Sequence, residues 1–377
     1  MPRFFRGVLC TPLFLCVACA ASARDAPRYA VDSALHGQAV RTTVDSELAQ
    51  YALQHYLRGE RVDPAQDAAL DRLVRELPAG TPDRAALAAI TQRHSADVAA
   101  ALLADRLLRE PRNARLQAAF ARNFEALDAG RRPAVVPAYR VLLAPGWLYR
   151  RNPGSGADFA RPRKVLADAG VDNVLLPTLE DGTVEHNAAI IAEQIRAYSE
   201  GGRPLILVSA SKAGPEVGEA LSLLTRANAA HSVRAWLNIG GILQGSPLAD
   251  RAEKPPGRWL ALLLAPFRHW SLASIDSMST RVSRPRFARW RLPRELLVIN
   301  FLGLPFSGNI TRAADYGYQR MKALGPNDGL TLLPDALAPD SLTLVQLGLD
   351  HYYLDPKIDL KTAALAQTVM QRLEAAR

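Results

Sequence analysis

Short apolar runs alternate with segments of helical periodicity from Tyr139 onward, and this alternation constrains the fold more than any other feature. Six runs have the length and composition of buried strands: 141–143, 174–176, 205–208, 235–239, 296–302 and 342–347. Helical stretches separate the first four runs: 163–169, 187–198 and 216–227. Strands that alternate with helices favour a mostly parallel sheet covered on both faces. We therefore predict an α/β, doubly wound fold over residues 137–377.

The chain before this domain has a different pattern. Between residues 44 and 127, apolar side chains recur at three- and four-residue spacing, which is typical of amphipathic helices. Residue pairs that end in proline mark the helix breaks: Asp63-Pro64, Thr81-Pro82 and Glu110-Pro111. We predict an all-helical N-terminal region over 24–136, used for packing or for binding a partner. Its sequence offers no metal-ligand cluster, glycine-rich loop or catalytic pair.

The N-terminus has the pattern of a secretory signal. Arg3 and Arg6 precede an apolar segment, 7–17, that is too short to span a bilayer, and the small-x-small sequence Ala21-Ser22-Ala23 follows. We predict a signal peptide over 1–23 and an exported protein, periplasmic or extracellular. Lipidation of Cys19 is the alternative, because Val17-Ala18-Cys19 ends like a lipobox, but Cys16 stands where leucine is expected.

Cysteine usage and charge follow from this prediction. All three cysteines, Cys10, Cys16 and Cys19, lie within the predicted signal, so the cleaved chain depends on its apolar core without disulfides. Cleavage also removes Arg3 and Arg6, which lowers the formal net charge from +9 to +7 (9 − 2). We expect no cofactor and no metal.

An insertion over 250–294 interrupts the strand and helix alternation after the fourth run. It carries ten Lys and Arg against three Asp and Glu, with Trp259, Trp270 and Trp290 among them. Nucleic acid is an unsuitable partner, because the chain shows no nucleic-acid-binding motif and is predicted to be exported. Arginines meet lipid phosphates and aromatic rings favour the membrane interface, so the insertion suits a lid in peripheral membrane contact. A solvated loop with a few buried side chains is the alternative.

A serine between small residues follows the third apolar run. The sequence Ser209-Ala210-Ser211-Lys212-Ala213-Gly214 stands between that run and a helix-like segment, 216–225. A nucleophile elbow needs this strand-to-helix turn, with small side chains on both sides of the serine. Ser211 is the candidate nucleophile. Ser209 and Lys212 also form the S-x-x-K pattern of penicillin-binding proteins and β-lactamases. The Ser-Asp-Asn and Lys-Thr-Gly motifs of these serine-lysine enzymes are missing from the sequence.

A serine nucleophile needs a histidine to accept its proton and an acid to orient that histidine. Of the seven histidines, only His351 directly follows a predicted strand. Asp328 is the preferred acid, because the adjacent Asp350 cannot easily aim its carboxylate at the neighbouring imidazole; Asp335 and Asp340 are weaker options. Asp328 also lies in an Asn-Asp-Gly sequence, which forms a turn without any catalytic role.

From Tyr139 to its end the chain resembles the α/β-hydrolase superfamily, closest to bacterial lipase- and esterase-like members. Three stretches carry the resemblance: a divergent elbow at 209–214, the segment from Asn238-Ile239-Gly240-Gly241 to Gly245-Ser246-Pro247-Leu248-Ala249-Asp250, and the acid loop Asn327-Asp328-Gly329-Leu330. The order serine, acid, histidine is also that of the superfamily. The resemblance implies hydrolysis of a small-molecule or lipid ester through an acyl-enzyme.

The resemblance also indicates where the oxyanion is bound. One donor is the amide after the nucleophile, that of Lys212, and the other comes from the loop after an early strand, where Trp147, or else Leu148, follows Pro145-Gly146. The elbow departs from the family pattern, with Ser209 and Ala213 at the usual glycine positions. These departures leave a second hypothesis, an inactive α/β-hydrolase scaffold that binds an envelope partner or a membrane surface.

Overall fold

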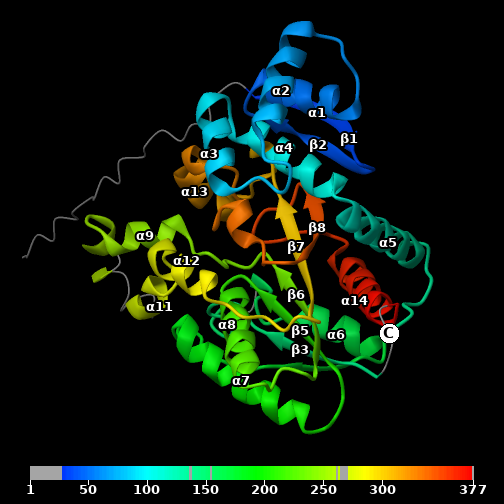
Figure 1. Cartoon of the computed structure of the whole chain (residues 1–377), viewed down its shortest axis with the longest axis vertical. Helices are drawn as coiled ribbons and strands as arrows, with labels where there is room; N and C mark the ends of the chain where they lie inside the picture. The colour runs from blue at the N-terminus through cyan, green and yellow to red at the C-terminus, as the bar shows by residue number, and fades with distance from the viewer. Residues whose placement is uncertain (1–27, 136–137, 153–154, 260–261, 264–270, 376–377) are drawn as a thin grey trace, which may run out of the picture.

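The computed structural model describes residues 28–135, 138–152, 155–259, 262–263 and 271–375. The predicted signal, 1–23, lies outside the described residues. Six strands form one parallel sheet in the order β4-β3-β5-β6-β7-β8 (Figure 1). They are β3 (Arg140–Ala144), β4 (Asp172–Leu175), β5 (Leu205–Ala210), β6 (Val233–Ile239), β7 (Leu297–Leu304) and β8 (Leu342–Leu347). The predicted strands and the α/β fold class are confirmed.

The strand order reverses between β3 and β5. The chain runs from β3 outward to β4, then returns to β5 on the other side of β3 and continues to β8. Such a reversal leaves a crevice beyond the carboxyl ends of these two strands, where open α/β sheets bind their ligands. The residues that follow β3 and β5 are therefore the first place to search for a site.

Helices cover both faces of the sheet, as a doubly wound fold requires. On one face, α7 and α8 bury apolar side chains against Leu142, Leu207 and Trp236. On the other face, α5, α6 and α14 pack on Val141, Val208 and other strand residues of opposite orientation. The bounds are α5 (Pro111–Asp128), α6 (Ala160–Asp168), α7 (Val184–Ser199), α8 (Ala213–Arg226), α13 (Arg312–Met321) and α14 (Ile358–Glu374).

The N-terminal region is not all-helical, and this part of the prediction is wrong. It opens with an antiparallel hairpin of β1 (Tyr29–Leu35) and β2 (Gln38–Val44). Both strands bury every fourth residue, and exposed and half-buried residues alternate between them in β1. His36 and Gly37, with φ of 46° and 83°, form the two-residue turn. Positive φ at both turn positions matches the twist of paired strands. The signal was present as period-two alternation around a glycine, which a search for helical spacing overlooks.

Helices follow the hairpin as predicted, with small differences at their starts. Pro64 and Pro111 each occupy a first helical position after the N-caps Asp63 and Glu110. The third helix begins later than Thr81-Pro82, because Asp83 accepts the Ala86 amide at 2.8 Å and caps it. The bounds are α1 (Glu47–Gln54), α2 (Pro64–Glu76), α3 (Arg84–Arg93) and α4 (Ala96–Arg109), with η1 (Tyr56–Arg58) between the first two.

The N-terminal region packs against the β8 edge of the sheet, at the top of Figure 1. Leu304 of β7 and Val345 of β8 share one buried cluster with α1 to α4. Three amides on the free edge of β8 receive side-chain acceptors from this region. They are Thr343 from Asn113 (2.8 Å), Val345 from Gln117 (3.1 Å) and Leu347 from Gln38 (3.2 Å). An edge strand that would otherwise be open to pairing is thereby covered.

The 250–294 insertion contains short helices, some of them packed on the core. Trp290 is buried against Trp236, with ring centroids 6.1 Å apart, and a Cβ on Gly218 of α8 would lie 2.2 Å from its ring. By contrast, Trp259 is 67% exposed, and Trp270 lies outside the described residues. The bounds are α9 (Pro247–Glu253), α11 (Leu272–Asp276) and α12 (Thr280–Ala288), while η3 (Ser307–Asn309), η4 (Lys322–Leu324) and η5 (Leu333–Ala336) follow later.

Candidate active site

Ser211 occupies the sharp turn between β5 and α8. Its φ of 55° is in the left-handed region, which costs a residue with a Cβ about 1–2 kcal/mol and persists only where neighbours impose it. Its amide donates to the Ile239 carbonyl at 3.1 Å, and its carbonyl accepts from the Ile242 amide at 3.1 Å. The end of β6 and the segment that follows it therefore hold the turn from both sides.

The close approach at this turn falls on Gly214 and not on the usual glycine positions. A Cβ on Gly214 would lie 2.8 Å from the Gly241 Cα, so α8 begins in contact with the backbone after β6. Ser209 is fully buried, and its hydroxyl accepts the Trp236 indole N–H at 2.9 Å. Ala213 is also fully buried. Ser209 and Ala213, which stand at the usual glycine positions, are thus small residues buried in the core.

His351 lies between Ser211 and Asp328. Its Nε2 is 2.9 Å from Ser211 Oγ, and its Nδ1 is 2.7 Å from Asp328 Oδ2. Asp328 is 2% exposed and His351 9% exposed. A carboxylate at Nδ1 favours the tautomer with its proton there, which leaves Nε2 free to accept the serine proton. The structure brings together the three residues that the sequence analysis selected.

Asp328 uses its two carboxylate oxygens for different contacts. Oδ1 accepts the Leu330 and Thr331 amides at 2.9 and 2.8 Å, which forms the expected turn. Oδ2 faces the imidazole, and the His351 amide donates to the Asp328 carbonyl at 3.0 Å. The turn and the histidine contact are therefore compatible, and the turn fixes the carboxylate for the imidazole.

The other candidate acids have different partners. Asp350 is buried and accepts the Thr311 amide (2.8 Å) and the Tyr352 amide (3.0 Å), so its carboxylate supports the loop that carries His351. Asp335 forms ion pairs with Arg84 and Arg284. Asp340 is exposed.

The two proposed oxyanion donors lie on the loops that follow β5 and β3. Lys212 is the N-cap of α8, and its amide has no acceptor among the described residues. Trp147 follows Gly146, whose added Cβ would lie 3.7 Å from the Ala210 carbonyl oxygen, so its loop runs beside the elbow. Leu148 donates its amide to the Glu180 carbonyl at 3.4 Å. Of the two residues considered after Pro145-Gly146, Leu148 thus has its amide engaged elsewhere.

The serine-lysine pattern does not bring its residues together. Ser209 Oγ bonds to Trp236, while Lys212 Nζ forms an ion pair with Glu216. A catalytic pair of this kind needs lysine and serine within hydrogen-bond reach.

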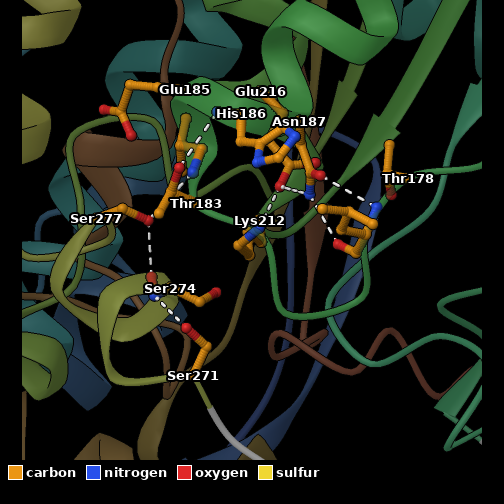
Figure 2. Close-up of polar contacts among 12 residues, drawn as sticks. Thr178, Thr183, Glu185, His186, Asn187, Lys212, Glu216, Ser271, Ser274 and Ser277 are labelled. Carbon is orange, nitrogen blue, oxygen red and sulfur yellow. Dashed lines mark hydrogen bonds and ion pairs between the residues drawn. The ribbon is translucent and has the colours of Figure 1, made fainter.

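Lys212, the residue after Ser211, belongs to a buried polar network (Figure 2). Lys212 and Glu216 are 2% and 1% exposed, and Asn187 Nδ2 donates to Glu216 Oε1 at 2.8 Å. Burial raises the pKa of Glu216, while the Lys212 ammonium opposes that shift. The spacing of Lys212 and Glu216, one helical turn apart, was a signal for this pair; Asn187 offered none.

A cavity of about 900 Å³ lies between the N-terminal helices and the insertion, away from Ser211. Its lining includes Asp335 and the two arginines that pair with this carboxylate, Arg84 and Arg284. Within the described residues, no cluster of three His, Cys, Asp or Glu side chains could hold a metal ion. None of the described helices has the length and apolarity of a membrane span.

No protein-family model and no curated protein matches the chain. Among solved structures, a metagenomic carboxyl esterase is similar at 23% identity and a TM-score of 0.50, over 66% of this chain and 80% of that one. A mature lipase of Bacillus licheniformis (24% identity, 58% and 88%, TM-score 0.47) and a soluble variant of the monoglyceride lipase of Saccharomyces cerevisiae (14%, 65% and 89%, 0.39) are further matches. The parallel sheet and the first of these matches give this chain an α/β-hydrolase fold.

Proposed function

We propose that the protein is a serine hydrolase that cleaves carboxylic esters, with Ser211 as nucleophile, His351 as general base and Asp328 as the acid that orients it. One observation carries the proposal: the hydrogen-bond chain of 2.9 Å from Ser211 to His351 and 2.7 Å from His351 to Asp328. These distances lie within the reach that proton transfer needs. The similar metagenomic protein is a carboxyl esterase, which agrees with this reaction class.

The reaction proceeds in two steps, acylation and deacylation of Ser211. Ser211 Oγ attacks the ester carbonyl carbon while His351 Nε2 takes the hydroxyl proton. The amides of Lys212 and Trp147 donate to the oxyanion that forms. The bond to the alcohol oxygen then breaks, the alcohol leaves with the proton from Nε2, and the acyl group stays on Ser211. Water then attacks the acyl carbon while His351 Nε2 takes one of its protons. The bond between Ser211 Oγ and the acyl carbon breaks, the acid leaves, and Nε2 returns the proton to Oγ.

An active-site-directed probe tests this function. A fluorophosphonate should label the wild type and Ser209→Ala, but not Ser211→Ala, because Ser211 is bonded to His351 whereas Ser209 is bonded to the Trp236 indole. Ser209→Ala serves as the matched control, since Ser209 is the neighbouring buried serine of the same turn. Folded wild-type protein that stays unlabelled would favour the scaffold hypothesis instead.

We propose further that the insertion meets an anionic lipid surface, where it presents a lipid ester to Ser211. Trp259, Leu262 and Leu263 are 67%, 51% and 64% exposed on its surface. Several of its cations are neutralised by ion pairs, such as Arg258 with Asp276 and Arg281 with Glu253. Exposed cations outside these pairs supply the remaining attraction to lipid phosphates: Arg251, Lys254, Arg289, Arg291 and Arg294.

Vesicle sedimentation tests this contact. The protein should bind phosphatidylglycerol vesicles better than phosphatidylcholine vesicles, and Trp259→Ser/Leu263→Ser should reduce binding severalfold. Val62→Ser is the control: Val62 lies in the loop before α2, is 62% exposed and is far along the chain from the insertion. Equal binding by the insertion variant and the wild type would remove the lipid surface from the proposal.

We propose that the site acts outside the cytoplasm, because of the predicted signal over 1–23. Expression of the full chain in a bacterium should yield a periplasmic or secreted product whose first residue is Arg24. A product that begins with an acylated Cys19 would support the lipoprotein alternative, and an uncleaved cytoplasmic chain would contradict export.

A further inference from the structure

The backbone and the side chain of Lys212 face different surroundings. Its amide stands at the start of α8, directly after Ser211, while its side chain turns into the interior between α7 and α8. There the ammonium pairs with Glu216, which lies one helical turn further along α8, and both side chains are nearly inaccessible. Figure 2 shows Lys212 and Glu216 facing each other, with Asn187 beside Glu216.

Asn187 joins this ion pair to the loop after β4. Its Nδ2 donates to Glu216 and to the Leu179 carbonyl (2.9 Å), and its Oδ1 accepts the Leu179 amide (3.1 Å). The chain closes tightly around this amide group, since a Cβ on Gly182 would lie 2.7 Å from Asn187 Oδ1. One side chain therefore links α8 to the 176–183 loop through three hydrogen bonds.

The first turn of α7 is also bonded to the insertion. The Val184 amide donates to Ser277 Oγ at 3.2 Å, and Arg286, which is 3% exposed, pairs with Glu185 at 2.6 Å. The network thus holds together the elbow, the loop after β4 and the described part of the insertion.

A buried ion pair adds little net stability to a fold, because the loss of hydration offsets the attraction between the charges. Two charges lose their hydration on burial, and apolar residues of similar volume often give an equal or more stable fold. The directional bonds of such a pair instead fix the backbone that carries them. In this chain that backbone is the turn that carries Ser211 and the Lys212 amide.

We propose that the Lys212–Glu216 pair, held by Asn187, is a positioning device for the Lys212 amide as an oxyanion donor. This inference rests on the proposed ester hydrolysis. Oxyanion donors work because they are already oriented when the negative charge develops, and small misplacements reduce the rate strongly. The network should therefore affect the transition state more than substrate binding.

Kinetics of a matched double variant tests this role. Lys212→Met/Glu216→Leu replaces the pair by apolar side chains without leaving a charge alone. We expect cooperative unfolding near the wild-type temperature, kcat reduced by about 10- to 100-fold, and KM changed less than about twofold. Binding of a trifluoromethyl ketone, which forms an oxyanion on Ser211, should weaken by the same factor as kcat.

The control removes another i,i+4 ion pair. Asp105→Leu/Arg109→Met acts on α4, in the N-terminal region, and should leave kcat unchanged. Wild-type kcat and ketone affinity in the Lys212 and Glu216 double variant would overturn the proposal. The proposal would also be overturned if both double variants lost kcat in proportion to their loss of thermal stability.

A measurement on the amide itself keeps this test separate from the proposed function. The chain has six lysines, so labelling with ¹⁵N-lysine gives six amide signals, and Lys212→Met identifies one of them. Glu216→Gln should shift or broaden the Lys212 signal and leave the other five in place. An unmoved Lys212 signal rejects the positioning role even if the enzyme is active. Absent fluorophosphonate labelling rejects the hydrolase function and does not affect the result of the amide measurement.

Discussion

Ser211 shows why an elbow without the usual glycines still forms. The steric demand falls on Gly214, where α8 starts against the backbone after β6, and on the left-handed backbone of Ser211 itself. Ser209 satisfies a buried indole N–H, so a hydroxyl suits this position. Sequence comparison with the family pattern marks the two departures but cannot weigh them, because the contact that excludes a side chain comes from another strand.

Asp328 provides the sharpest test at the scale of one residue. Asp328→Asn keeps an oxygen for the turn amides but presents no negative charge to His351. We expect kcat to fall by about 10³- to 10⁴-fold with little change in unfolding temperature, because the imidazole loses its oriented tautomer. Steady-state kinetics on a p-nitrophenyl ester and circular dichroism measure the two quantities.

Asp350→Asn is the matched control for that variant. Asp350 is the adjacent buried acid and bonds to the Thr311 and Tyr352 amides, so the same change should reduce kcat by less than about tenfold. If the two variants lose equal activity, Asp328 has no special role as the orienting acid.

At the scale of elements, the N-terminal region completes the sheet. Its helices were predicted from their spacing, but the sequence left open whether they pack on the α/β domain or stand apart. Gln38 and Gln117 supply acceptors to the amides of Leu347 and Val345 on the edge of β8. Amphipathic spacing reveals that a helix has a buried face, and it does not reveal which strand edge that helix covers.

The edge contacts make a measurable prediction. Gln117→Leu leaves the Val345 amide without its acceptor, which should lower the free energy of unfolding by about 1–3 kcal/mol in urea titrations. Gln319→Leu is the control: Gln319 is exposed on α13 and its side chain bonds to the nearby Asp315, so its loss should have little effect. An unchanged stability of Gln117→Leu would mean that water or another group satisfies this amide.

At the scale of the whole molecule, a buried carboxyl joins the N-terminal region to the α/β domain. Asp97 on α4 accepts the Ser307 amide (2.9 Å) after β7, the Ser307 hydroxyl (2.6 Å) and the Asp45 amide (2.8 Å). Burial, followed by the nearby Asp45 carboxylate, raises the pKa of Asp97 from 3.8 to about 7. The junction therefore titrates near neutral pH.

This pKa predicts how stability changes with pH. Between about pH 4 and pH 7 the folded chain holds a proton on Asp97 that the unfolded chain has lost. The contribution of Asp97 to the free energy of unfolding is therefore full below about pH 4 and is lost as the pH rises to about 7. The total loss is roughly 4 kcal/mol at most. Urea titrations at several pH values should show this slope in the wild type.

Two variants isolate the contribution. Asp97→Asn cannot titrate. The unfolding free energy of the wild type minus that of the variant should therefore fall as the pH rises from about 4 to about 7. Asp45→Asn removes the neighbouring charge and should shift the slope to lower pH. A pH-independent difference between wild type and Asp97→Asn would contradict the raised pKa.

The sequence alone determined the parallel sheet, the position of Ser211 after a buried strand, and the choice of Asp328 and His351. These depend on local patterns, namely apolar runs, turn residues and the ends of strands. Only the tertiary structure decided three matters. They are the β1–β2 hairpin against the predicted helices, the cover over the β8 edge, and the buried Lys212–Glu216–Asn187 network. The hairpin is local, but its period-two pattern is not detected by a search for helical spacing. The cover over β8 and the bond from Asn187 to Glu216 are contacts between segments far apart in the chain, and no local pattern states which distant side chain satisfies a given polar group.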